Sequence, residues 1–172
     1  HTISAYEIKR PSFISVNTGA TLPTLTGDGE QRLRGLEWST YGNLTKELSL
    51  LGGITHIKSE QRNTGRDTYG TPKWRARIGL DWQTPVQGLK VGGRMIYTGS
   101  QWSDSGNKLR VPSWNRFDLN TSYATKVVNR PVRLNASVEN VTGKKYWIGT
   151  FGDGFVMPGA PRTFRLSATE SF

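Results

Sequence analysis

Period-two alternation of apolar and polar residues runs through most of this chain, and it is the feature that most constrains the fold. In the clearest segment, Trp74, Ala76, Ile78, Leu80 and Trp82 alternate with charged, polar or glycine residues. The same pattern recurs over residues 2–10, 36–40, 48–54, 89–98, 116–123, 132–139 and 162–172. Successive side chains of a β-strand point to opposite faces, so the pattern predicts an all-β chain of about eight strands, each with one apolar and one polar face.

The connections between these segments alternate between short and long. Short turns are expected near 42–45, 84–88 and 125–130, and long polar loops near 11–29, 62–71, 100–108 and 143–161. This sorting places the tight turns at one end of an antiparallel sheet and the long loops at the other. It is typical of an up-and-down transmembrane β-barrel with periplasmic turns and extracellular loops.

Composition narrows the class without deciding the function. The 23 Lys and Arg exceed the 13 Asp and Glu, and the formal net charge of +10 suggests an anionic partner. No apolar run approaches the ~20 residues of a membrane helix. A barrel strand needs no such run, because only every second residue has to be apolar. Without Cys, disulfides and thiolate zinc sites are excluded. The chain begins at His1 with no signal segment, so we expect a fragment or a chain whose beginning was removed, with a processed N-terminus as the alternative.

Catalytic and metal-binding patterns are not found in the sequence. Two histidines are too few for a His-based metal site, and no nucleophile elbow, P-loop or dinucleotide fingerprint occurs. We therefore expect no enzyme, no resident metal and no intrinsic cofactor.

Three groups of residues are candidates for function. Aromatic residues at the ends of apolar faces are candidates for a membrane-interface girdle, or for ordinary core packing; they are Trp74, Trp82, Tyr97, Tyr123 and Phe172. The polar faces carry a series of charges expected to point inward, where guanidinium groups can pair with carboxylates or attract an anionic ligand; they include Arg75, Arg77, Arg94, Arg116, Asp118, Arg133 and Arg165.

The third group lies in the predicted loops and is the candidate ligand-binding set. Aromatic faces and a few polar donors suit a bulky, partly apolar ligand, although loop aromatics also pack against one another and stiffen the loops. The set comprises Arg66, Tyr69, Trp102, Tyr146, Trp147, Phe151 and Phe155.

Six short motifs follow one another in a fixed order. They are RGLE at 34–37, LSLLGG at 48–53, PKWR at 72–75, VPSWNRFD at 111–118, NVTGKKY at 140–146 and the closing stretch 161–172. Together they cover about residues 30–172 and resemble TonB-dependent outer-membrane receptors. Val141 and Gly143 stand where the family usually has Leu and Asp.

The resemblance implies a receptor for ferric siderophores, with a barrel of about 22 strands closed by an N-terminal plug and energised through TonB. Residues 1–172 would be the C-terminal part of that barrel, about eight of its strands, with the plug absent. The inward-facing charges would then contact the plug. Ferric siderophore would be the ligand of the full receptor. The resemblance favours ferric hydroxamates among them, although haem and cobalamin receptors share the barrel.

The implied partners are TonB through the missing plug, outer-membrane lipid, lipopolysaccharide and the barrel-assembly machinery, for which Phe172 would be the terminal signal. Basic residues at the outer rim are candidates for lipopolysaccharide phosphates; they include Lys108, Lys144, Lys145 and Arg162. Two alternatives stay open. One is a closed eight-stranded outer-membrane barrel acting as an adhesin or envelope anchor. The other is a soluble basic β-protein that binds nucleic acid, which the even spread of basic residues disfavours.

Overall fold

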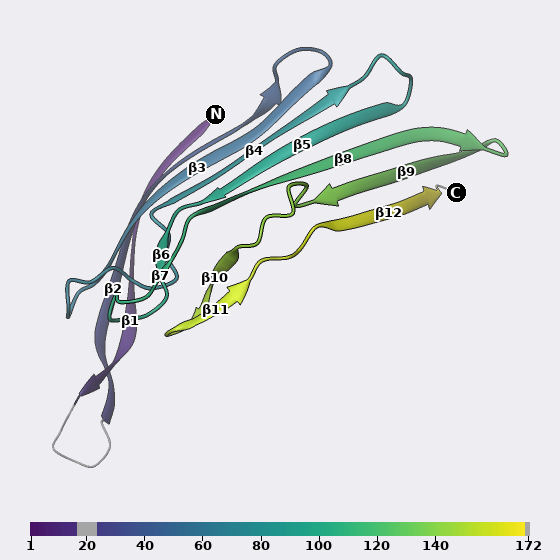
Figure 1. The fold of residues 1–172 in the computed structure, drawn as a ribbon. Helices are drawn as coiled ribbons and strands as arrows, with labels where there is room; N and C mark the ends of the chain where they lie inside the picture. The colour runs from purple at the N-terminus through teal and green to yellow at the C-terminus, as the bar shows by residue number, and fades with distance from the viewer. Residues whose placement is uncertain (17–23, 171–172) are drawn as a thin grey trace.

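One antiparallel sheet of eight strands dominates the structure, a computed structural model that describes residues 1–16 and 24–170. The strand order is β1-β2-β3-β4-β5-β8-β9-β12, and each strand of the sheet lies beside the next one in the chain (Figure 1). The strands are β1 Thr2–Val16, β2 Thr24–Asn43, β3 Leu48–Gln61, β4 Trp74–Gln83, β5 Leu89–Thr98, β8 Trp114–Val127, β9 Arg130–Glu139 and β12 Thr163–Glu170. Two small hairpins lie in the long loops: β6 (Gln101–Trp102) pairs with β7 (Arg110–Val111), and β10 (Trp147–Gly152) with β11 (Phe155–Pro158). Among the described residues, no helix is long and apolar enough to span a membrane.

The predicted eight strands and the sorted connections are confirmed, but the long loop expected over 11–29 is wrong. β1 continues to Val16 and β2 begins at Thr24, so the two strands stay paired beyond the rest of the sheet. The pairing passes through a register shift between Ser12 and Ile14. Pairing there depends on backbone hydrogen bonds, which need no alternation of apolar and polar residues that a search of the sequence could detect.

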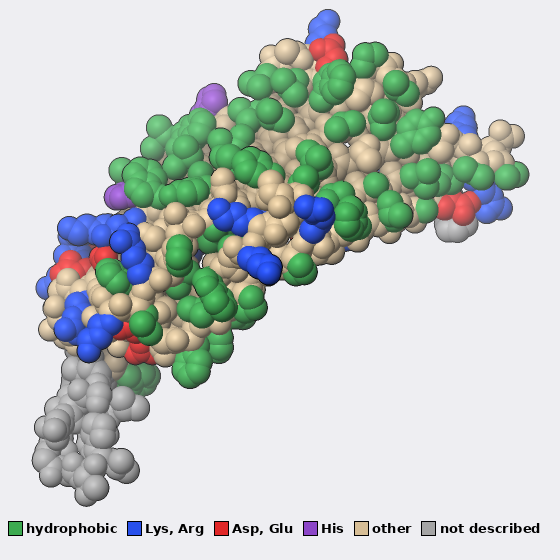
Figure 2. All heavy atoms as spheres, viewed as in Figure 1, with side chains coloured by type: hydrophobic (Ala, Val, Ile, Leu, Met, Phe, Trp, Pro, Cys, Tyr) green, Lys and Arg blue, Asp and Glu red, His purple; other side chains and the backbone are tan. Residues whose placement is uncertain are grey.

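Cross-strand pairing collects the apolar side chains on one face, called here the apolar face. Leu80, Gly93, Leu119, Val138 and Phe164 are successive Cα partners across five strands. Large hydrophobic side chains on this face are exposed: 42% for Leu80, 52% for Leu119 and 71% for Phe164. Figure 2 shows such side chains spread over most of the visible surface.

Few hydrophobic side chains are buried in the part of the chain that the structure describes. The buried ones are Ile57, Val111 and Trp114. A soluble sheet of this size would bury its apolar face against a second layer. An exposed apolar face with a charged opposite face is what a membrane-spanning sheet presents, with lipid on one side and water on the other. The soluble nucleic-acid-binding alternative is therefore not supported.

The outer edges of the sheet do not meet within residues 1–16 and 24–170. β1 pairs with β2 and β12 pairs with β9, and the strand order is linear (Figure 1). An eight-stranded closed barrel requires the first strand to pair with the last. That alternative is not supported either.

At the short-turn end of the sheet, tight turns close the hairpins and one ion pair joins β9 to β12. Val128 and Asn129 both have positive φ, 50° and 62°, and join β8 to β9 as a two-residue turn. Glu170, the one charge on the apolar face of β12, accepts a hydrogen bond from Arg130 Nη1 at 3.0 Å. The charge that interrupts the apolar pattern of the last strand is therefore paired.

Replacing Ile78, near the middle of the apolar face of β4, by Arg is expected to destabilise the folded barrel by about 2–4 kcal/mol, because the charge enters hydrocarbon. The measurement is the free energy of unfolding of the complete protein in lipid vesicles by denaturant titration. The control is Asn120→Arg, an exposed position on the opposite face, where the cost should be near zero. Equal costs for both variants would contradict the assignment of the faces.

Candidate functional site

The face opposite the apolar face carries the charged residues predicted to point inward. Register and period two place all seven of them on this polar face, which is defined by Arg75, Arg77, Arg94, Arg116, Asp118, Arg133 and Arg165. Arg94 of β5 and Asp118 of β8 are direct Cα partners. The sequence pattern thus brings opposite charges together across neighbouring strands.

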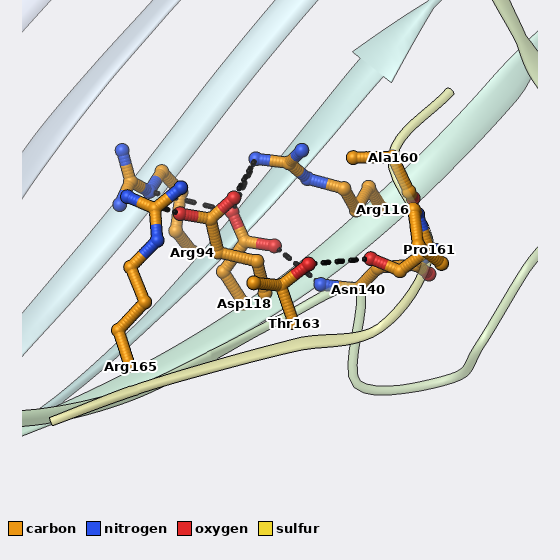
Figure 3. A network of polar contacts seen from close by, with 9 residues as sticks. Arg94, Arg116, Asp118, Asn140, Ala160, Pro161, Thr163 and Arg165 are labelled. Atoms are coloured by element: carbon orange, nitrogen blue, oxygen red, sulfur yellow. Dashed lines mark hydrogen bonds and ion pairs between the residues drawn. The ribbon is translucent and has the colours of Figure 1, made fainter. Parts of the chain in front are cut away.

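Asp118 is the centre of the polar face. Its side chain is 5% exposed. Arg116 Nη2 donates to its Oδ2 at 2.9 Å, Arg94 Nε lies 3.9 Å from the same oxygen, and the Asn140 N–H donates to Oδ1 at 2.9 Å (Figure 3). A carboxylate removed from water needs such partners, and here two cations and one backbone donor supply them.

Glu139 extends this network to the last strand. Arg116 Nη2 lies 3.8 Å from Glu139 Oε2, and Arg165 Nη1 lies 3.2 Å from Glu139 Oε1. Three arginines and two carboxylates therefore connect β5, β8, β9 and β12. Among the described residues, no ion pair joins Arg75, Arg77 or Arg133 to a carboxylate, so their charge is the less compensated part of this face.

Asn140 attaches the loop that follows β9 to this network. It is fully buried and has a φ of 54°, a conformation that Asn tolerates better than most residues. Its Nδ2 donates to the carbonyls of Lys144 at 2.9 Å and Ala160 at 3.1 Å, and its Oδ1 accepts from the Lys144 N–H at 2.9 Å. One side chain thus holds both ends of the loop. The motif at 140–146 marked the segment, but sequence reasoning missed this role.

Tyr146 is packed into the wall of the same loop. Its ring lies 4.4 Å from that of Trp114, centroid to centroid, and it covers Gly159, where a side chain would collide with the ring. Tyr146 is half-buried and Trp114 is buried. Both residues line a cleft of ≈ 690 Å³ whose other lining residues include Lys144, Lys145, Trp147 and Arg162.

Hydrogen bonds tie the three long loops to one another. Asp153 accepts from the Ser105 N–H at 2.8 Å and from Ser105 Oγ at 2.6 Å. The Asp67 N–H donates to Asn107 Oδ1 at 2.9 Å, and the Gly70 N–H to the Trp102 carbonyl at 2.9 Å. The segments 62–73, 99–113 and 143–162 therefore form one loop assembly at the end of the sheet away from the short turns.

Comparison with known proteins decides the family. Residues 1–141 match the model described as TonB dependent receptor-like, beta-barrel. The chain belongs to this family. The predictions of an all-β outer-membrane barrel and of a protein that is not an enzyme are confirmed on the same ground.

Related receptors cover nearly the whole chain. It is 29% identical to the ferrichrome receptor FcuA of Yersinia enterocolitica, over 99% of this chain and 23% of that protein. It is similar to the crystal structure of BauA, the ferric preacinetobactin receptor from Acinetobacter baumannii, with 34% identity, a TM-score of 0.85 and coverage of 99% of this chain and 27% of the other. The chain thus spans about a quarter of the length of these TonB-dependent receptors.

In this barrel the residues predicted for the girdle lie on the apolar, lipid-facing side. Trp74, Trp82, Tyr97 and Tyr123 are 51%, 48%, 38% and 39% exposed. Trp74 packs on His56 at 4.4 Å between ring centroids. Phe172 lies outside the described residues.

The seven candidate ligand residues separate into exposed and supporting ones. Phe151 and Phe155 face each other at 5.7 Å in the β10–β11 hairpin and are 65% and 63% exposed, and Trp147 is 46% exposed. Arg66 is also exposed, whereas Tyr69, Trp102 and Tyr146 are half-buried. Trp102 lies under the Arg110 guanidinium at 5.7 Å.

Asp104 stabilises the 99–113 loop in a pH-dependent way. The Leu109 N–H donates to its Oδ1 at 2.6 Å and the Lys108 N–H at 3.0 Å, and these bonds, led by the one from Leu109, hold the pKa of Asp104 below its ordinary value. Because the folded pKa is lowered, the stabilisation is complete above the unfolded value and is lost as the pH falls through the folded one. At neutral pH the Asp104 carboxylate therefore gives the loop its full stabilisation.

Asp118→Ala is expected to destabilise the folded receptor by about 3 kcal/mol, because it leaves the Asn140 N–H and two arginines without their acceptor. The measurement is denaturant unfolding of the complete receptor, together with protease cleavage within 143–162. The matched control is Asp81→Ala, an exposed carboxylate on the same face, which should change stability by less than about 0.5 kcal/mol. Unchanged stability and cleavage in Asp118→Ala would contradict its central role.

Proposed function

We propose that the complete protein is an outer-membrane receptor that takes up ferric siderophores with energy from TonB, and that residues 1–172 form the C-terminal part of its barrel, about eight of about 22 strands. The observation that carries this proposal is the similarity to siderophore receptors over 99% of the chain. The proposed plug and its TonB contact lie in parts of the receptor other than this chain.

The polar face supports a role in uptake. Arg75, Arg77 and Arg133 line the barrel interior on β4 and β9 and are exposed. Cations on an interior wall attract an anionic ligand and also contact the polar surface of a plug. The Asp118 network, in contrast, is internally paired and maintains the sheet.

The loop assembly supports ligand capture at the outer end of the barrel. Trp147, Phe151 and Phe155 present exposed aromatic surface, and Arg66 adds an exposed cation. Such surface suits a bulky ferric complex that is partly apolar. Tyr69, Trp102 and Tyr146 are half-buried, and we assign them to packing within the loops.

The remaining proposed partners follow from the outer-membrane location. Lipid covers the apolar face, and lipopolysaccharide surrounds the barrel in the outer leaflet. The alternating strand β12 (Thr163–Glu170) leads to Phe172, the proposed signal for the barrel-assembly machinery.

The proposal is tested by growth under iron limitation. A strain that lacks the complete gene should fail to grow on at least one single ferric siderophore that supports the parent, and a plasmid copy should restore growth. Ferrichrome, ferrioxamine and preacinetobactin are the first compounds to supply, with haem and cobalamin as separate arms. Growth of the deletion strain equal to the parent on every siderophore, or a defect confined to haem or cobalamin, overturns the proposal.

Replacing both Phe151 and Phe155 by Ala is expected to weaken binding of the ferric siderophore about tenfold, because two exposed aromatic faces are removed from the ligand surface. Affinity is measured by fluorescence quenching or calorimetry on the purified receptor. Phe164→Ala is the matched control, since Phe164 is equally exposed but faces lipid. An unchanged affinity in the double variant would remove this hairpin from the site.

A further inference from the structure

On the lipid-facing side of β1, β2 and β3, the side chains change abruptly from apolar to charged. The last row without Lys, Arg, Asp or Glu consists of four Cα partners on neighbouring strands: Ala5, Leu36, His56 and Trp74. The next row toward the loops contains Glu7, Arg34 and Lys58, and the row after it contains Lys9, Arg32 and Glu60. These six residues are called here the outer-wall cluster.

Register fixes the height of this cluster relative to the membrane. Arg34 follows Leu36 by two positions, so both side chains leave the same face of β2. Two residues of a strand span about 6.6–6.8 Å, so the cluster begins within about 7 Å of the row that contains Trp74. Aromatic side chains in such rows lie at the lipid headgroups, and the outer-wall cluster therefore lies at or just above them.

The cluster is organised around Glu7. Arg32 Nη2 donates to its two carboxylate oxygens at 2.9 and 2.8 Å, and Arg34 Nε donates to Oε2 at 2.7 Å. Lys9 Nζ lies 3.7 Å from Oε1. One carboxylate thus aligns two guanidinium groups. Arg34 is the more exposed of the two and keeps N–H groups free to bind a further acceptor, whereas the Nε of Arg32 is buried.

Positive charge is in excess at this site. Four basic residues face two acidic ones, and the Arg34 side chain is 53% exposed and the Lys9 side chain 57% exposed. Figure 2 shows basic side chains, with acidic ones among them, gathered at one end of the hydrophobic surface. A ligand in the barrel interior cannot reach them, because the strands lie in between.

We propose that the outer-wall cluster binds a phosphate group of the phosphorylated glycolipid of the outer leaflet, the lipid A part of lipopolysaccharide. Guanidinium groups held in place by a carboxylate match phosphate oxygens in pairs, and Lys58 adds a point charge beside them. The apolar rows below, with Leu36 and Trp38 exposed at 58% and 37%, offer a surface for the acyl chains of the same molecule. This site is distinct from the rim lysines and Arg162, which line the loop cleft, and it rests on the outer-membrane location of the proposed receptor.

The test uses the complete receptor purified from outer membranes, with the double variant Arg34→Gln and Lys58→Gln. Each cation near a lipid surface is worth about a fivefold change in affinity, so binding of lipopolysaccharide should weaken about 25-fold. Binding is measured with purified lipopolysaccharide and with its dephosphorylated form, and co-purified lipid A is counted by mass spectrometry. The wild type should bind the dephosphorylated form more weakly than intact lipopolysaccharide, with an affinity close to that of the glutamine variant.

Two control variants keep the outcome interpretable. Lys46→Gln with Lys126→Gln removes the same charge at the short-turn end, from exposed positions, and should bind as the wild type does. Arg34→Lys with Lys58→Arg keeps the charge and should retain most of the binding. Three results would overturn the site. The glutamine variant could bind lipopolysaccharide as tightly as the wild type does, or the Lys46 and Lys126 variant could lose as much affinity as the glutamine variant. The third is a wild type that binds phosphorylated and dephosphorylated lipopolysaccharide equally well. Siderophore-dependent growth is scored separately; it should be unchanged in the glutamine variant, and its failure in every strain would count against the proposed function and not against this site.

Discussion

Backbone hydrogen bonding between neighbouring strands is the constraint on which the rest of this structure depends. Inside a bilayer no water pairs with backbone N–H and C=O groups, so each strand must stay in register with its neighbours. That register, with its period of two, then decides whether a side chain meets lipid or the barrel interior. A slip of one residue between β5 and β8 would move Asp118 into hydrocarbon and Leu119 into the interior, and the Arg94–Asp118 pair opposes that slip. Sheet register and interior charge therefore reinforce each other.

The same carboxylate connects the sheet to the loops. Asp118 holds the Asn140 N–H, and Asn140 holds both ends of the 140–162 loop through Lys144 and Ala160. The loop in turn binds the neighbouring loop through Asp153 and Ser105. The position of the exposed Phe151 and Phe155 pair at the barrel mouth is thus set by a chain of polar contacts that starts inside the barrel. The interior network therefore sets the position of the loop assembly, which is the proposed surface for ligand capture.

The sequence predicted what depends on local alternation and missed what depends on distant contacts. Strand number, face and turn positions follow from the period of two, as in the segment from Trp74 to Trp82. The extension of β1 and β2 was missed, because outside hydrocarbon no face has to be apolar. The turn at Val128 was located only approximately, since Val is unusual at positive φ. The burial of Tyr146 against Trp114 joins residues 32 positions apart, and the Asp153–Ser105 contact residues 48 apart; single-segment patterns carry no signal for either.

Charge on the lipid-facing side marks where the hydrocarbon ends. From the row of Leu36 and Trp74 to the row of Leu134 and Tyr123, the outward positions of the eight strands hold no Asp, Glu, Lys or Arg. Ion pairs then appear at both limits, but they differ in kind. At the short-turn end, Arg130 and Glu170 neutralise each other one to one. At the loop end, Glu7 is shared by several cations, and the cluster keeps a positive excess. A pair that only ended the apolar band would need no such excess, so the excess at the loop end supports the proposed anionic ligand on that side of the membrane.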